Sequence, residues 1–109
     1  MTTEPGFGLH PGAAQDITEI WEYIAEDSVL AARRFREEII EAISRLALFP
    51  QQGHRRTDLT MRPLRFQVVR EYLVAYAPDE KPILVIAVLH GRRNPRVIAG
   101  ILQDRGQVP

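Results

Sequence analysis

A cluster of side chains that could bind anions or transfer protons lies in the segment His90-Gly91-Arg92-Arg93. The imidazole of His90 has a reference pKa of about 6.5, which suits a general acid or base. The guanidinium groups of Arg92 and Arg93 suit bidentate contacts with carboxylates or phosphates. An unbroken apolar run, Ile83 to Leu89, comes directly before this segment. Such a run is typical of a strand covered on both faces, so we expect a buried strand to end at the cluster.

Other candidate residues lie upstream of this strand. Arg65 alternates with apolar neighbours and could line the active face of a sheet, and Arg56 lies in a polar, arginine-rich loop between residues 51 and 63. For His90 the alternative is a hydrogen-bonding role at the strand end, and for the arginines it is simple solvent exposure. His10 and His54 have no partners at metal-ligand spacing, so we expect no metal site and no cofactor.

Composition limits the classes of function that remain. The 109 residues suit a single domain, 1–109, with 45% hydrophobic and 26% charged residues, as in ordinary soluble globular proteins. The absence of cysteine excludes disulfides, thiolate zinc sites and cysteine nucleophiles. No segment resembles a signal peptide or a membrane span, so we expect a cytoplasmic protein.

Charge is unevenly distributed, although the formal net charge is zero. Residues 1–50 hold nine acidic and four basic side chains, whereas residues 51–109 hold five acidic and ten basic ones. The second half could therefore meet an anionic partner, either a nucleic acid or an acidic protein segment. The alternative is that the two halves neutralise each other within the fold.

Two amphipathic helices are predicted before residue 50. The first opens at Pro11 and has apolar residues at three- and four-residue steps, with Asp16 on the opposite, solvated side. Asp27-Ser28 interrupts the pattern and offers the cap of a second helix, which Pro50 stops. We expect Trp21 and Phe35 in the core. The pairs Arg33–Glu37, Arg34–Glu38 and Glu41–Arg45 have the i,i+4 spacing of helix-surface ion pairs.

Strand patterns follow the loop. Alternation predicts strands near residues 64–68 and 72–77, with turns at Arg70-Glu71 and Pro78–Pro82, and a weaker strand is predicted at residues 7–9. Asn94-Pro95 combines a capping residue with proline at the first helical position, so a short C-terminal helix should follow, closed by Arg105-Gly106. The order predicts an α+β fold, with an N-terminal strand and a helical hairpin packed on a mainly antiparallel sheet.

Four segments follow one another along the chain: IWEYIAEDS with the following Ala31-Ala32, LALFPQQGHRRTDL (Leu46–Leu59), LRF with YLVAY (Leu64–Phe66, Tyr72–Tyr76) and VLHGRRN (Val88–Asn94). Together, in this order, they resemble the ParE toxins of the RelE/ParE superfamily, the toxin half of bacterial type II toxin–antitoxin modules. A departure is Arg70-Glu71, where relatives often have a glycine in the hairpin.

The resemblance implies two different kinds of toxin. ParE-like toxins bind and poison DNA gyrase, are neutralised by a ParD-like antitoxin and need no catalytic group. RelE-like toxins are ribosome-dependent, metal-independent mRNA endonucleases, and here His90 would act with Arg65, Arg92 or Arg93. The HGRR segment and the isolated Lys81 favour the ParE type. A third possibility is an inactive, toxin-derived binding module.

On the leading interpretation, four arginines contact the target or the antitoxin: Arg56, Arg65, Arg92 and Arg93. The partners are then the antitoxin and gyrase, with no membrane and no sequence-specific DNA binding by the toxin alone.

Overall fold

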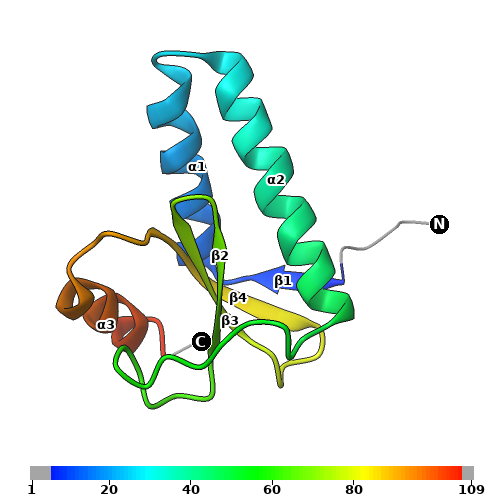
Figure 1. Cartoon of the computed structure of the whole chain (residues 1–109), viewed down its shortest axis with the longest axis vertical. Helices are drawn as coiled ribbons and strands as arrows, with labels where there is room; N and C mark the ends of the chain where they lie inside the picture. Colours follow the sequence, from blue (N-terminus) through cyan, green and yellow to red (C-terminus); the bar gives the residue numbers. More distant parts are fainter. Residues whose placement is uncertain (1–5, 107–109) are drawn as a thin grey trace.

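The computed structural model describes residues 6–106, in which helices and strands follow the predicted order (Figure 1). A strand and a helical hairpin come first, and three strands and a short helix follow. The elements are β1 (Phe7–Leu9), α1 (Pro11–Ala25), α2 (Val29–Leu48), β2 (Arg65–Val69), β3 (Tyr72–Ala77), β4 (Ile83–His90) and α3 (Pro95–Asp104). The predicted α+β class is therefore confirmed. None of the helices in this part of the chain is long and apolar enough to cross a membrane.

The strands within residues 6–106 form one sheet in the order β1-β4-β3-β2. β3 pairs antiparallel with both β2 and β4, whereas β1 runs parallel to β4. The prediction of a mainly antiparallel sheet is thus confirmed. The register places Tyr72 opposite His90 at one end of β3, and Tyr76 opposite Arg65 at the other.

The two faces of the sheet have different covers. On one face, α1 and α2 bury a cluster that includes Phe35, Ile39 and Tyr76, and the hairpin extends well beyond the sheet (Figure 1). On the other face, α3 and the loop before β2 bury Leu59, Phe66 and further apolar residues. β4 is consequently buried on both faces, as the apolar run predicted.

β4 contains a bulge that simple alternation does not predict. Ala75 of β3 lies opposite Ala87, but Tyr76 lies opposite Val85, so Ile86 is an additional residue on β4. Ile86 and its neighbour Ala87 both belong to the cluster under α3, so two consecutive side chains point to one face. The bulge leaves the Ile86 carbonyl available to a partner outside the sheet.

Local capping signals confirm two predicted helix starts. Ser28 Oγ accepts the N–H of Ala31 at 3.1 Å, and Asn94 Oδ1 accepts the N–H of Arg96 at 2.9 Å, with Pro95 in the first turn of α3. The start of α1 is capped by His10, whose Nδ1 accepts the N–H of Gly12 at 2.9 Å. Polar side chains thus satisfy backbone groups at the start of each of these helices.

Several surface predictions need correction. Trp21 is only partly buried, whereas Phe35 is in the core as predicted. Glu38 does not pair with Arg34: it accepts two hydrogen bonds from Arg70, whose side chain reaches across from the β2–β3 turn. The predicted Glu41–Arg45 pair does form, at 3.1 Å.

Asp16 also differs from its prediction, because its side chain is 11% exposed and paired with Arg105, which is 19% exposed. The interpretation of Asp16 as part of a solvated face was therefore wrong. Its partner Arg105 lies 89 positions away in the chain, so the periodicity of the helix could not reveal the pair.

Candidate functional site

The cluster predicted from the sequence lies where β4 ends. His90 is part-exposed, and its Nδ1 accepts the backbone N–H of Arg92 at 3.1 Å. Its Nε2 lies 3.7 Å from a carboxylate oxygen of Glu71, in the β2–β3 turn. Its ring meets the Tyr72 ring edge-on, with centroids 5.7 Å apart. His90 therefore holds the chain as it turns from β4 toward α3, and its second nitrogen faces an acidic neighbour.

Arginines follow His90 on the exposed side of this turn. Arg92, Arg93 and, in the first turn of α3, Arg96 are all exposed. The ion pairs found within residues 6–106 leave these three without a carboxylate partner. An unpaired group of guanidiniums suits recognition of carboxylates or phosphates on another molecule.

A cavity of about 420 Å³ opens beside His90, between the helical hairpin and the β2–β3 turn. Its apolar wall includes Phe35 and Tyr72, whose rings meet edge-on at 5.1 Å, and Tyr23, which is 75% exposed. Burial raises the pKa of the Tyr72 hydroxyl, and the nearby Glu71 carboxylate and Tyr23 add to the rise. The neutral phenol and the apolar wall suit an aromatic or aliphatic side chain of a protein partner.

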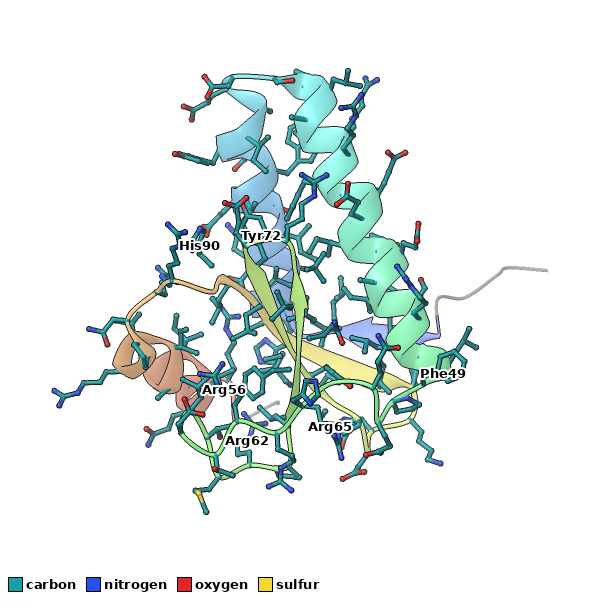
Figure 2. All side chains as sticks on the ribbon, viewed as in Figure 1. Phe49, Arg56, Arg62, Arg65, Tyr72 and His90 are labelled. Atoms are coloured by element: carbon teal, nitrogen blue, oxygen red, sulfur yellow. The ribbon has the colours of Figure 1, made fainter. Side chains whose placement is uncertain are left out.

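Arg65 lies at the opposite end of the sheet from His90, as Figure 2 shows. Its guanidinium donates to the carbonyl of Gly53 at 2.7 Å. The Tyr76 hydroxyl donates to the Pro50 carbonyl at 2.7 Å and accepts the Gly53 N–H at 2.9 Å. Together, the Arg65 and Tyr76 side chains fasten the loop that follows α2.

The other loop arginines also make internal contacts. Arg56 forms two hydrogen bonds with Asp58, at 2.9 and 2.8 Å, and these hold the pKa of the Asp58 carboxyl below its usual value. Arg62 donates to the Leu102 carbonyl at 2.9 Å and so ties the loop to α3 (Figure 2). Of the predicted site residues, the structure thus brings together His90, Arg92 and Arg93, and places Arg56 and Arg65 elsewhere.

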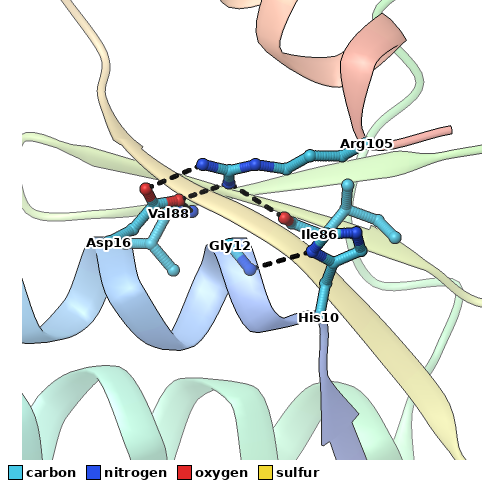
Figure 3. Close-up of polar contacts among 6 residues, drawn as sticks. All are labelled: His10, Gly12, Asp16, Ile86, Val88 and Arg105. Atoms are coloured by element: carbon cyan, nitrogen blue, oxygen red, sulfur yellow. Dashed lines mark hydrogen bonds and ion pairs between the residues drawn. The ribbon is translucent and has the colours of Figure 1, made fainter. Parts of the chain in front are cut away.

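An ion pair between α1 and the end of α3 holds the arginine-bearing segment in place (Figure 3). Arg105 Nη1 and Nη2 donate to the Asp16 carboxylate at 2.6 and 3.0 Å, and Nη1 also reaches the Ile86 carbonyl at 3.1 Å. Asp16 in turn accepts the N–H of Val88 at 3.0 Å. β1 pairs only with residues 83–85 of β4, so the backbone groups of β4 beyond residue 85 have no strand partner on that edge. The Asp16 and Arg105 side chains supply hydrogen bonds to two of these groups, the Val88 N–H and the Ile86 carbonyl.

His10 lies beside this ion pair. Burial lowers its pKa, and the positive charges of Arg105 and Arg62 lower it further. A neutral His10 keeps the Nδ1 acceptor that caps α1 (Figure 3). A Cβ at position 12 would overlap the Arg105 guanidinium, so a larger residue there would push this side chain from its place beside Asp16.

Sequence reasoning missed Glu71, Tyr72 and Arg96 as members of the site. The first two meet His90 only through the β3–β4 register, which the sequence does not give directly. Arg96 could have been found, because it lies within one helical turn of Arg92 and Arg93 and follows a clear capping residue. Within residues 6–106, no group of His, Asp or Glu side chains is arranged to hold a metal ion.

Comparison with known proteins gives one result. The family model described as "ParE toxin of type II toxin-antitoxin system, parDE" matches residues 8–95, most of the chain. A search of curated proteins found no match. The matched range includes both ends of the sheet and the segment from His90 to the start of α3.

Proposed function

This chain belongs to the ParE toxin family of type II toxin–antitoxin systems, and on that premise we propose that it inhibits DNA gyrase by direct binding and is neutralised by a ParD-like antitoxin. The exposed segment of His90, Arg92 and Arg93 is the proposed contact region. Arg56 and Arg65 act in this proposal mainly by shaping the loop beneath α3, because their guanidiniums are engaged within the chain.

The separation of His90 from Arg65 is the observation that argues against a nuclease built on that pair, and the assay below tests a nuclease built on His90 with Arg92 or Arg93. Cleavage of RNA by a side-chain mechanism needs a proton-transfer group and a cation positioned on the same phosphate. His90 and Arg65 lie opposite Tyr72 and Tyr76, at the two ends of β3, so their backbones are about 13 Å apart along the strand. His90 also uses one ring nitrogen to accept from Arg92.

The cavity beside His90 supports a protein partner. It combines exposed aromatic surface on Tyr23 with buried apolar side chains, and a polar rim of Arg70, Glu71 and His90. Aromatic pockets with polar rims are typical anchor sites in protein interfaces. An antitoxin that covers this cavity would also cover the His90 end of the sheet.

A purified-component assay tests the choice of target. We expect the wild-type chain to inhibit supercoiling by gyrase and to leave mRNA intact on translating ribosomes. The conservative change His90→Gln should retain most of the inhibition, since an amide can still accept from the Arg92 N–H. Cleavage of mRNA by the wild type that falls by about 10²–10⁴ in His90→Gln would instead identify a nuclease with His90 as its proton-transfer group.

The double change Arg92→Ala with Arg93→Ala tests the contact region. We expect loss of gyrase inhibition with an unchanged unfolding midpoint, because exposed arginines without partners contribute little to stability. Arg33→Ala with Arg34→Ala is the matched control, since these adjacent arginines on α2 are also exposed. Full inhibition by the folded Arg92/Arg93 variant would remove these residues from the contact region.

A further inference from the structure

Gly100 lies in the middle of α3, where glycine has no role in the fold of the chain itself. A Cβ built at this position meets no atom within 4 Å. By contrast, a Cβ at Gly53 would lie 2.7 Å from the Tyr76 hydroxyl, and one at Gly12 would overlap Arg105. Glycine inside a helix destabilises it relative to alanine. The open space above Gly100 therefore needs an explanation from outside the chain.

The surface around Gly100 is one continuous face of α3. Arg96 and Val97 precede it by four and three residues and Asp104 follows it by four, the spacings that share a helix face, and Arg93 comes just before the capping residue Asn94. Val97 is 46% exposed, and both arginines are exposed. The opposite face, with Ile98 and Leu102, is buried against the sheet. The outer face therefore has no side chain at its centre, with Arg96 and the partly exposed Val97 on its N-terminal side and Asp104 at its C-terminal end.

We propose that the N-terminal part of this outer face of α3, formed by Arg96, Val97 and Gly100 together with Arg93 just before the helix, is the docking surface for an acidic segment of the antitoxin. The glycine lets the backbone of that segment approach α3 closely, with Val97 packed against its apolar side chains. The two arginines pair with its carboxylates. This inference rests on the proposed function only in taking the antitoxin as partner, a partner that the family match supplies.

Charge and shape favour a protein segment over a nucleic acid. The whole chain has zero net charge, and its first half, which includes both hairpin helices, has nine acidic against four basic residues. A nucleic acid carries its charge along its whole length and would meet repulsion from that half, whereas a short acidic segment can be confined to the positive end of α3. Phosphate contacts also make no use of an exposed valine or of a missing side chain at Gly100, whereas close packing of two protein backbones uses both.

The test measures the dissociation constant of the toxin for its cognate antitoxin, using full-length chains. Gly100→Gln places a long side chain on the face, and we expect the dissociation constant to rise at least about tenfold. Gly100→Ala should raise it less while increasing the unfolding midpoint of the free toxin, because alanine favours the helix. Arg96→Ala should weaken binding and reduce its salt dependence. The matched control is Ala14→Gln, at an exposed position of α1.

Gyrase inhibition by the free toxin, measured on the same variants, separates this inference from the proposed function. If the wild type does not inhibit gyrase but Gly100→Gln still weakens antitoxin binding, the docking surface stands and the gyrase proposal fails. An unchanged dissociation constant in a folded Gly100→Gln variant would overturn the docking surface. Arg96-dependent binding of duplex DNA with unaltered antitoxin affinity would also overturn it.

Discussion

Each end of β3 carries a tyrosine, but the two hydroxyl groups differ in their hydrogen bonds. Tyr76 is fully buried, and its hydroxyl makes hydrogen bonds with both Pro50 and Gly53. Tyr72 is nearly as buried, but its hydroxyl makes no hydrogen bond within residues 6–106 and lines an open cavity. The Tyr76 end is closed by internal partners and stabilises the fold. The Tyr72 end keeps polar and aromatic groups free, which is what binding a partner requires.

The largest expected effect separates the two hydroxyls. Tyr76→Phe leaves the buried Gly53 N–H and the Pro50 carbonyl without their partner, and should lower the free energy of unfolding by about 2–4 kcal/mol. Tyr72→Phe should change it by less than about 0.5 kcal/mol, because no internal hydrogen bond is lost. Urea unfolding of both variants measures the difference. Equal losses of unfolding free energy in the two variants would mean that the two hydroxyls contribute equally to stability, contrary to this comparison.

A smaller loss of unfolding free energy is expected from Gly53→Ala, again at the Tyr76 end of β3. The added Cβ would lie 2.7 Å from the Tyr76 hydroxyl and 2.8 Å from the Phe66 carbonyl, so the loop must shift. We expect a loss of about 1–3 kcal/mol, the usual cost of overpacking. Gly91→Ala, at the Tyr72 end of β3, is the control, because the nearest atom to a Cβ added there is the Glu71 carbonyl oxygen, at 3.3 Å. A larger loss in Gly91→Ala would reverse the comparison.

The β2–β3 turn, at the Tyr72 end of β3, should tolerate substitution. Arg70 has a φ of 57°, in the left-handed region that glycine adopts more easily. Arg70→Gly relieves strain of about 1 kcal/mol but removes the exposed pair with Glu38. We therefore expect the unfolding midpoint to remain close to that of the wild type. Glu38→Gln, which removes the pair and keeps the strain, should be the less stable of the two.

Alkaline pH should weaken the fold through both tyrosines. Burial raises the pKa of each hydroxyl, so the folded state holds these protons more tightly than the unfolded state does. Stability is then fully present below the unfolded pKa of about 10 and falls as pH rises above it. Unfolding measured from pH 8 to 11 should show this decline, and Tyr76→Phe should flatten it. A stability that rises with pH above 10 would contradict this assignment.

Local signals predicted much of the fold. The caps at Ser28 and Asn94, the proline at position 95 and the apolar run of β4 each act over a few residues, so the sequence displays them directly. The bulge at Ile86 and the Asp16–Arg105 pair depend on which distant segments meet, and a single sequence does not record that. For the same reason, His90 was predicted as a candidate without its neighbours Glu71 and Tyr72.

The Asp16–Arg105 pair also has a consequence for the order in which a newly made chain matures. Synthesis at about 5–20 residues per second separates the two residues by about 4–18 s, since they are 89 positions apart. During that interval the hairpin helices and the strands are made, but the edge of β4 has only Asp16 of its two side-chain partners until Arg105 follows. The arginine-bearing helix is thus fixed only after every strand of the sheet has been made, and a chain that terminates before Arg105 lacks the pair that holds it.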